Sequence, residues 1–306
     1  MSKSKWYLLI LLFVVGALVV SCGPSPTATP IPTKEPTIEF KTPLPEATQA
    51  QIVPTDTPMP SPPTPTPLPT VEEVEEEEKG PSVTDIMIEI PAGSFLMGND
   101  AGRDDEAPAH AVDLPAFEID KFEVTNADFA VFVEAVGHET DAEKEGLSRF
   151  WRDAAQDKEG HPVVYVSWND AKAYCEWCEK RLPTEAEWEK AARGTDGRLY
   201  PWGNEYDPTK LNGKDSGIRG TTAVGSYASG TSAYGVEDMA GNVWEWVADW
   251  YEAYPSSSYR SPYYGEQYRA LRGGGWFETD DFVRASVRNA TSVTAANDDI
   301  GFRCAR

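Results

Sequence analysis

A long stretch rich in proline and threonine limits which part of this chain can fold. Residues 24–70 hold 15 prolines and 11 threonines, as in "TPMPSPPTPTPLPT". Proline fixes φ and lacks a backbone donor, so such a stretch stays extended and builds no core. The run "VEEVEEEEKG" that follows carries like charges that repel one another. We therefore expect residues 23–81 to be a linker and residues 82–306 to be the folding unit, which holds nine of the ten tryptophans.

The first 22 residues, "MSKSKWYLLILLFVVGALVVSC", have the pattern of an export signal. Two lysines precede an apolar run over residues 6–20, which is short for a bilayer span and typical of a signal-peptide core. "VVSC" resembles a bacterial lipobox. This predicts a lipoprotein signal peptide over residues 1–22, lipidation of Cys22, and a place in the cell envelope, anchored to a bacterial membrane and facing outside the cytoplasm. An uncleaved N-terminal anchor is the alternative.

The charge balance argues against nucleic acid as a partner. Fifty Asp and Glu against 27 Lys and Arg give a formal charge of −23. An anionic surface repels phosphate backbones. The same composition suits solubility and divalent cations.

The first part of the folding unit predicts strands and then a helix. "MIEIPAGSFLMGN" alternates apolar and polar residues and predicts a strand, followed by a loop over residues 98–106. "AVDLPAFEIDKFEV" predicts a further strand. Thr125 marks the start of a helix and Gly137 its end. Apolar residues lie between them at helical spacing: Phe129, Phe132, Val133 and Val136.

Two more helices are expected before the chain becomes rich in glycine and tryptophan. One begins at Ser167 in "VSWNDAKAYCEWCEKR", and Thr184 with Glu187 forms a capping box for the next, which Gly194 ends. From "YPWGNE" onward only short strands are expected. The fold class is α+β, with few helices and many loops. The helix after Ser167 is expected to bury one face: Ala171, Tyr174, Cys175 and Cys178.

Several long motifs occur together in a fixed order. They include "IPAGSFLMGN", "HPVVYVSWNDAKAYCEWCEKRLPTEAEWEKAARG", "AYGVEDMAGNVWEWVADWY", "LRGGGW" and "IGFRCAR". Over about residues 86–306 the chain resembles the formylglycine-generating enzyme or sulfatase-modifying factor family. The resemblance implies a C-type-lectin-like α+β fold. It also implies the family's reaction, in which Cu(I) and oxygen convert a sulfatase cysteine to formylglycine.

The thiolates that this reaction needs are missing from the sequence. Active members hold Cu(I), a soft ion, with two cysteines between the "GGSW"-like turn and "GFRC". Residues 273–301 contain no cysteine. By the resemblance, the first ligand position falls near Glu278, the second falls in "DDFVR", and the family's serine is Gly275. Carboxylates do not replace thiolates for Cu(I), so copper is not expected and no catalytic residue is predicted.

The cysteines of the folding unit are expected to be structural. Cys175 and Cys178 form a C-x-x-C, but no second pair accompanies them and the three histidines are scattered, which argues against zinc. The resemblance implies a disulfide between Cys175 and Cys304, as suits an exported protein. Cys178 would then be a small buried apolar side chain.

The resemblance also implies structural calcium in "EDMAGNVWEW". Its ligands would be Asp238, the carbonyls of Gly241 and Val243, and Glu245, and such oxygen ligands on irregular backbone suit calcium. Ordinary acidic turns are the alternative. A second and weaker set lies in "LNGKDSGI": Asn212, Gly213, Ile218, and Asp215 or Ser216.

The segment after "LRGGGW" is a candidate binding surface. In relatives, which include variable proteins of diversity-generating retroelements, this stretch forms a ligand-binding face, and short polar side chains suit adaptable hydrogen bonding. A plain solvated loop is the alternative. The candidates are Trp276, Glu278, Asp280, Asp281, Arg284, Arg288 and Asn289.

Two functions from different classes follow. The first is a membrane-tethered, non-oxidase binding or accessory module with an extracytoplasmic protein or glycan as ligand. The second is a formylglycine-generating oxidase with a divergent active site.

Overall fold

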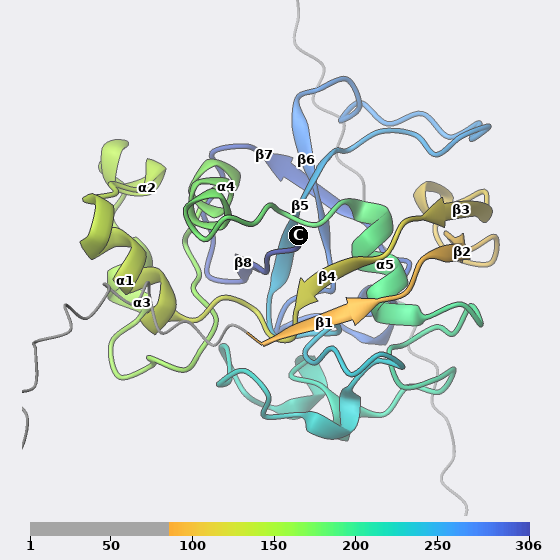
Figure 1. The fold of residues 1–306 in the computed structure, drawn as a ribbon, viewed down its shortest axis with the longest axis horizontal. Helices are drawn as coiled ribbons and strands as arrows, with labels where there is room; N and C mark the ends of the chain where they lie inside the picture. The colour runs from red at the N-terminus through yellow and green to blue at the C-terminus, as the bar shows by residue number, and fades with distance from the viewer. Residues whose placement is uncertain (1–85) are drawn as a thin grey trace, which may run out of the picture. The chain divides into compact units, whose positions relative to one another are not determined.

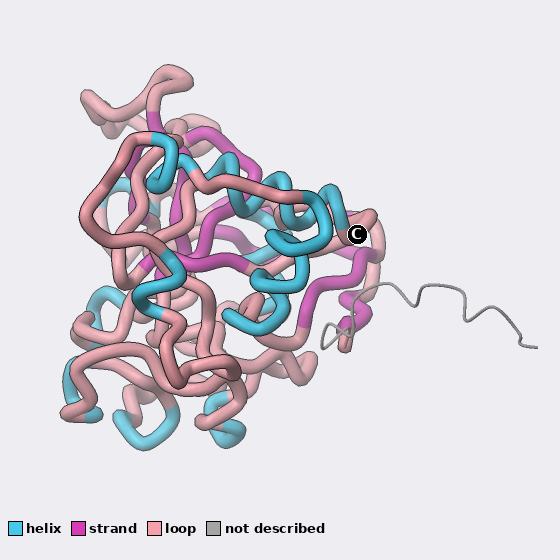
Figure 2. The backbone as a smooth tube through the Cα atoms, turned by 90° about the vertical axis from the view of Figure 1, so that its left-hand side faces the viewer, coloured by secondary structure: helices cyan, strands magenta, loops and turns pink. Residues whose placement is uncertain are grey.

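The computed structural model describes residues 86–306. The predictions for the signal peptide, for Cys22 and for the linker over residues 23–81 lie outside these described residues. The fold is α+β with short elements, as expected, and Figure 2 shows how much of the backbone lies in loops. Within residues 86–306, no helix has both the length and the apolar character needed to cross a membrane.

The first four strands pair as two separate two-stranded sheets. β1 (Met87–Ile90) pairs with β4 (Phe117–Asp120), and β2 (Gly93–Met97) pairs with β3 (His110–Leu114), both antiparallel. The single strands expected over "MIEIPAGSFLMGN" and "AVDLPAFEIDKFEV" are therefore each broken in two. Each break contains a proline, Pro91 or Pro115. Proline has no backbone N–H to donate to a neighbouring strand, so the ladder of hydrogen bonds ends there.

The three predicted helices form, with the predicted caps. Thr125, Ser167 and Thr184 each accept a hydrogen bond from the third residue of their helix. Val136 is an exception to the expected buried face, since it is 52% exposed near the end of its helix. The helices are α1 (Asn126–Val136), α2 (Asp141–Lys144), α3 (Trp151–Ala154), α4 (Trp168–Trp177) and α5 (Glu185–Arg193).

A four-stranded sheet lies at the centre of the described chain (Figure 1). Its order is β7-β6-β5-β8, with β5 and β8 parallel and the other pairs antiparallel. The strands are β5 (Trp244–Trp250), β6 (Tyr268–Arg272), β7 (Asn289–Ser292) and β8 (Ile300–Phe302). Short 3-10 turns η1 (Asp104–Glu106), η2 (Pro208–Lys210), η3 (Lys214–Ser216), η4 (Ala228–Gly230) and η5 (Asp280–Phe282) interrupt the loops.

The largest apolar core packs α1 and α4 against the central sheet. Phe129 stacks on Tyr174 with ring centroids 5.9 Å apart, and Tyr174 meets Phe302 of β8 at 5.4 Å. Trp244 and Trp246 are buried in the same core. Trp250 is half-buried instead and stacks on the guanidinium of Arg269.

A second group of contacts fixes α5, and it is made of buried charges. Arg272 is fully buried and donates to Glu185 and Glu189 of α5 at 3.1 and 2.6 Å. Arg288 is also buried and binds Glu185 through two nitrogens, at 2.6 and 2.8 Å. Burial alone would raise the pKa of Glu185, but the two guanidinium groups outweigh it and hold that pKa below its usual value.

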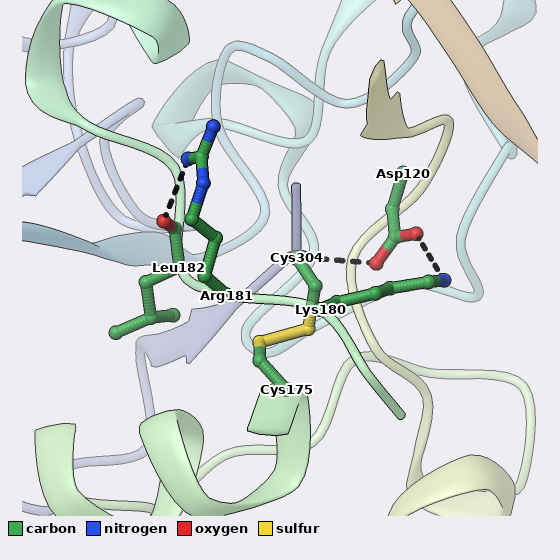
Figure 3. Close-up of a disulfide and its surroundings, with 6 residues drawn as sticks. All are labelled: Asp120, Cys175, Lys180, Arg181, Leu182 and Cys304. Carbon is green, nitrogen blue, oxygen red and sulfur yellow. Dashed lines mark hydrogen bonds and ion pairs between the residues drawn. A yellow bond between two sulfur atoms is a disulfide. The ribbon is translucent and has the colours of Figure 1, made fainter. Parts of the chain in front are cut away.

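The disulfide between Cys175 and Cys304 is present, with an S–S distance of 1.99 Å. It joins the end of α4 to the C-terminal segment (Figure 3). The Asp120 carboxylate accepts there from the Cys304 backbone N–H and from Lys180. Cys178, expected to be fully buried, is only half-buried, because α4 ends there and the side chain lies at the rim of the core.

Breaking this disulfide should lower the stability of the protein clearly. The bond closes a loop of 129 residues, for which chain entropy gives about 4–5 kcal/mol as an upper figure. We expect the Cys175→Ala/Cys304→Ala variant to melt well below the wild type, and Cys178→Ala to melt close to it. Thiol counting on the denatured full chain supplies the check: residues 86–306 should contribute one reactive thiol, and three would contradict the pairing.

Candidate functional site

A tight glycine turn begins the segment that the sequence analysis singled out. Gly273 and Gly274 have φ of +95° and +81°, where a side chain is strained. A Cβ on Gly274 would lie 2.8 Å from the carbonyl oxygen of Phe282, so the turn packs directly against η5. The turn thereby fixes the next residues, Trp276 to Glu278, beside β5.

Two carboxylates lie next to Trp244 after this turn. Glu278 is half-buried, and its Oε1 accepts from Nε1 of Trp244 at 3.3 Å. Asp299 is buried, and Gly275 lies between it and Trp244. A Cβ added to Gly275 would lie 3.4 Å from Oδ2 of Asp299 and 3.4 Å from Cδ1 of Trp244. Burial raises the pKa of Glu278, and burial with the charges of Asp298 and Glu278 raises the pKa of Asp299 to about 6. This pair holds protons near neutral pH more readily than free carboxyl groups do.

The other predicted ligand residues fall into two groups. Asp280, Asp281 and Asn289 are exposed and free to meet a ligand. The two arginines are committed to the protein. Arg284 donates to Glu106 at 2.8 Å, and Arg288 is 1% exposed and bound to Glu185. Arg288 is thus wrong as a ligand-binding candidate, because its charge is buried beneath the surface by a partner distant in sequence.

A pocket of about 280 Å³ opens beside Trp276. The indole donates to the carbonyl of Asp298 at 3.3 Å and forms part of the wall. The rest of the wall comes from segments that the sequence analysis did not connect with this site. These residues include Arg149, Asp153, Lys158, Tyr165 and Arg219.

Comparison with known proteins agrees with this geometry. A family model described as "Sulfatase-modifying factor enzyme 1-like domain" matches residues 70–306. The chain belongs to this family. A mouse protein named inactive C-alpha-formylglycine-generating enzyme 2 is 38% identical over 272 residues, covering 72% of this chain and 85% of that protein.

Other members of the family are as similar. The formylglycine-generating enzyme of Streptomyces coelicolor is 37% identical over 286 residues, covering 74% of this chain and 90% of that protein. Among solved structures, PvdO from Pseudomonas aeruginosa aligns with a TM-score of 0.55 and 29% identity over 72% of this chain and 93% of that one. The sulfatase-modifying fold is therefore shared with relatives named as active and as inactive.

The donor set of this family member does not fit Cu(I). Between Gly273 and Gly301 the side chains beside Trp244 are the Glu278 and Asp299 carboxylates, and no residue of that segment is a cysteine. Cys178, the described cysteine outside the disulfide, lies at the end of α4. Hard oxygen ligands do not hold Cu(I) in place of thiolates.

The first predicted calcium set lies in a cluster with excess negative charge. Glu245 is fully buried and accepts from Arg303 at two points, each 2.7 Å. Asp238 accepts from the Gly225 N–H at 2.6 Å. Burial, with the charges of Asp238 and Glu245, raises the pKa of Glu123 well above its usual range, and Oε2 of Glu123 has no hydrogen-bond partner. One guanidinium thus faces three buried carboxylates, and both oxygens of Glu245 are already bound by Arg303, with Oε2 also accepting from Trp188.

The second predicted calcium set does not converge. Oδ1 of Asn212 accepts from Ser216, while the exposed Asp215 accepts from Tyr206. Ile218 is 42% exposed, and Gly213 packs against the carbonyl oxygen of Glu278. Within the described residues, no group of three or more His, Cys, Asp or Glu side chains is arranged to hold a metal ion.

Replacing Asp299 by asparagine should stabilise the protein at neutral pH. The pKa of Asp299 rises from 3.8 to about 6 on folding, so the unfolded chain loses this proton first as the pH increases. The buried charge of Asp299 therefore lowers the free energy of unfolding increasingly between pH 3.8 and about pH 6, and the loss is complete above that range. The melting temperature of Asp299→Asn should exceed that of the wild type above pH 6 and match it below pH 3.8. Asp280→Asn, which removes an exposed carboxylate, is the control; a gain for Asp299→Asn that is equal at both pH values would contradict the assignment.

Proposed function

We propose that this chain is a membrane-tethered, non-oxidase member of the sulfatase-modifying family that acts as a binding or accessory module. The observation that carries the proposal is the donor set beside Trp244, where the side chains are the carboxylates of Glu278 and Asp299 and residues 273–301 contain no cysteine. These groups accept hydrogen bonds and hold protons, and they supply no soft ligand for copper. The similarity to a protein named as inactive agrees with this proposal.

The binding face would be built around Trp276. Trp276 contributes to the pocket wall, while Asp280, Asp281 and Asn289 are exposed further along the chain. Aromatic and short polar side chains on a rigid frame suit recognition of an extracytoplasmic protein or glycan. Nucleic acid is not a proposed partner, because the chain carries a formal charge of −23.

The module would be held at a bacterial membrane by a lipid on Cys22 and would face outside the cytoplasm, in the cell envelope. The support is the "VVSC" motif and the long proline-rich linker over residues 23–81. A Cys22→Ala chain should leave the membrane fraction. Its complete retention there would contradict the lipid anchor.

Calcium would stabilise the fold without taking part in chemistry. Asp238, Glu245 and the carbonyls of Gly241 and Val243 would hold the ion and neutralise the cluster that Glu123 joins. We expect calcium added to chelator-treated protein to raise the melting temperature by several degrees, and Asp238→Ala to abolish that rise. A wild-type protein with the same melting temperature in calcium and in chelator would refute the site.

The alternative is a formylglycine-generating oxidase with a divergent site, which the similarity to the Streptomyces enzyme favours. The deciding experiment incubates the full chain with Cu(I), oxygen and a peptide carrying the sulfatase Cys-x-Pro-x-Arg motif, and measures aldehyde by mass spectrometry. We expect no aldehyde above the peptide-only background, while an active relative in parallel converts the peptide. Turnover by this chain would overturn the non-oxidase proposal.

A further inference from the structure

The pocket beside Trp276 combines segments that lie far apart in the sequence. Lys158 follows α3, Tyr165 precedes α4, and Arg219 follows η3. Tyr165 has φ of +58°, and its N–H donates to the carbonyl of Asn297 at 2.9 Å, which fixes it against the chain that carries Asp298. Separate loops that contact one another thus form the walls of the pocket. Its volume of about 280 Å³ is near the lower end of the range for small-ligand sites.

Basic side chains gather in this pocket although the chain as a whole is strongly acidic. Arg149, Lys158 and Arg219 line it together with two carboxylates, Asp153 and Asp298. Three positive and two negative groups give a local balance of +1, against −23 for the whole chain. A local reversal of charge in a concave site attracts anions.

Two of these cations have no partner within the part of the chain that the structure describes. Among residues 86–306, neither the Arg219 guanidinium nor the Lys158 ammonium group has a hydrogen-bond or salt-bridge partner. Several other surface cations are paired, as in Lys144 with Asp141, or Arg198 with Asp196. The donors of the pocket are therefore available to a ligand.

The remaining wall groups favour a sugar ring. Trp276 and Tyr165 supply aromatic surface, and Arg149 interacts with Tyr165. Asp153, Asp298 and Thr221 supply polar atoms that can bond to hydroxyl groups. Arginine forks match the planar oxygens of a carboxylate and also bind sulfate oxygens.

We propose that this pocket binds a saccharide ring that bears an anionic group, held by Arg219, Lys158 and Arg149 around Trp276. The inference rests on the proposed binding function and gives it a ligand class. This pocket is a poor site for a peptide with the sulfatase motif Cys-x-Pro-x-Arg. The arginine of that motif would meet a pocket with an excess of positive charge.

The test measures binding of three trisaccharide probes to the full chain by titration calorimetry. The probes are a galacturonic acid trimer, a sulfated galactose trimer and a neutral galactose trimer. We expect either or both anionic probes to bind at least about tenfold more tightly than the neutral one, with affinity falling as salt is added. Preference between carboxylated and sulfated sugar then identifies the source of the anion.

Matched variants locate the site. Arg219→Gln should weaken binding of the anionic probe by about tenfold. It should leave the melting temperature unchanged, because the Arg219 side chain has no hydrogen-bond or ion-pair partner among residues 86–306. Arg260→Gln removes the same charge from an exposed position outside the pocket and should bind like the wild type.

Three results would overturn the ligand assignment: equal binding of neutral and anionic sugars, no binding of any probe, or equal losses in the two arginine variants. An acidic peptide that binds more tightly than every sugar would do the same. None of these results bears on the non-oxidase proposal, which the aldehyde assay decides separately.

Discussion

Buried pairs of arginine and carboxylate hold this structure together. Arg272 and Arg288 connect β6 and the segment before β7 to Glu185 and Glu189 of α5. Arg303 connects the C-terminal segment to Glu245 of β5 and donates to the carbonyls of Asp120, Lys121 and Glu237. Each guanidinium thus binds a strand or helix and at least one backbone carbonyl of another segment. This explains how a domain with so few regular elements fixes long stretches of irregular backbone.

We call these buried pairs of Arg272, Arg288 and Arg303 the frame. The residues that stabilise the fold are therefore different from those that form the candidate site. The buried pairs lie beneath the glycine turn, where Gly273 packs against Trp188 of α5 and Trp188 donates to Glu245. The residues after the turn, Trp276 to Phe282, lie on top of this frame. The carboxylates of Glu278 and Asp299 beside Trp244 decide which ligands this surface can hold, and neither takes part in the buried arginine pairs below. Relatives named as active and as inactive can therefore share one fold.

Local signals in the sequence predict the three longest helices, α1, α4 and α5, but neither the short helices α2 and α3 nor the contacts between distant segments. Thr125, Ser167 and Thr184 act within four residues, so the sequence alone identifies them as caps. The alternation of apolar and polar residues does not predict the strand breaks at Pro91 and Pro115, although proline is a local signal for such a break. The disulfide came from the family resemblance and is confirmed.

The pocket and the buried charges could not be predicted in the same way. "EAEWEKAAR" has the composition of a surface helix, yet Glu185, Glu189 and Lys190 are buried, because their partners lie far away in the sequence. Arg288 is predicted to bind a ligand because its partner, Glu185, is also distant in the sequence. Lys158, Arg219 and Trp276 meet only in the folded chain, and no local pattern marks them as one site.

The most direct test of this account compares frame and surface by denaturant unfolding of the full chain. Arg272→Met keeps the volume but takes the partner from Oε2 of Glu189, whose Oε1 stays bound to Arg193, and it should cost about 3–5 kcal/mol or prevent folding. Trp276→Ala combined with Arg219→Gln alters the proposed binding face and should cost about 1 kcal/mol or less. If the surface variant loses as much stability as the frame variant, or if Arg272→Met unfolds like the wild type, the separation of frame from binding face is wrong.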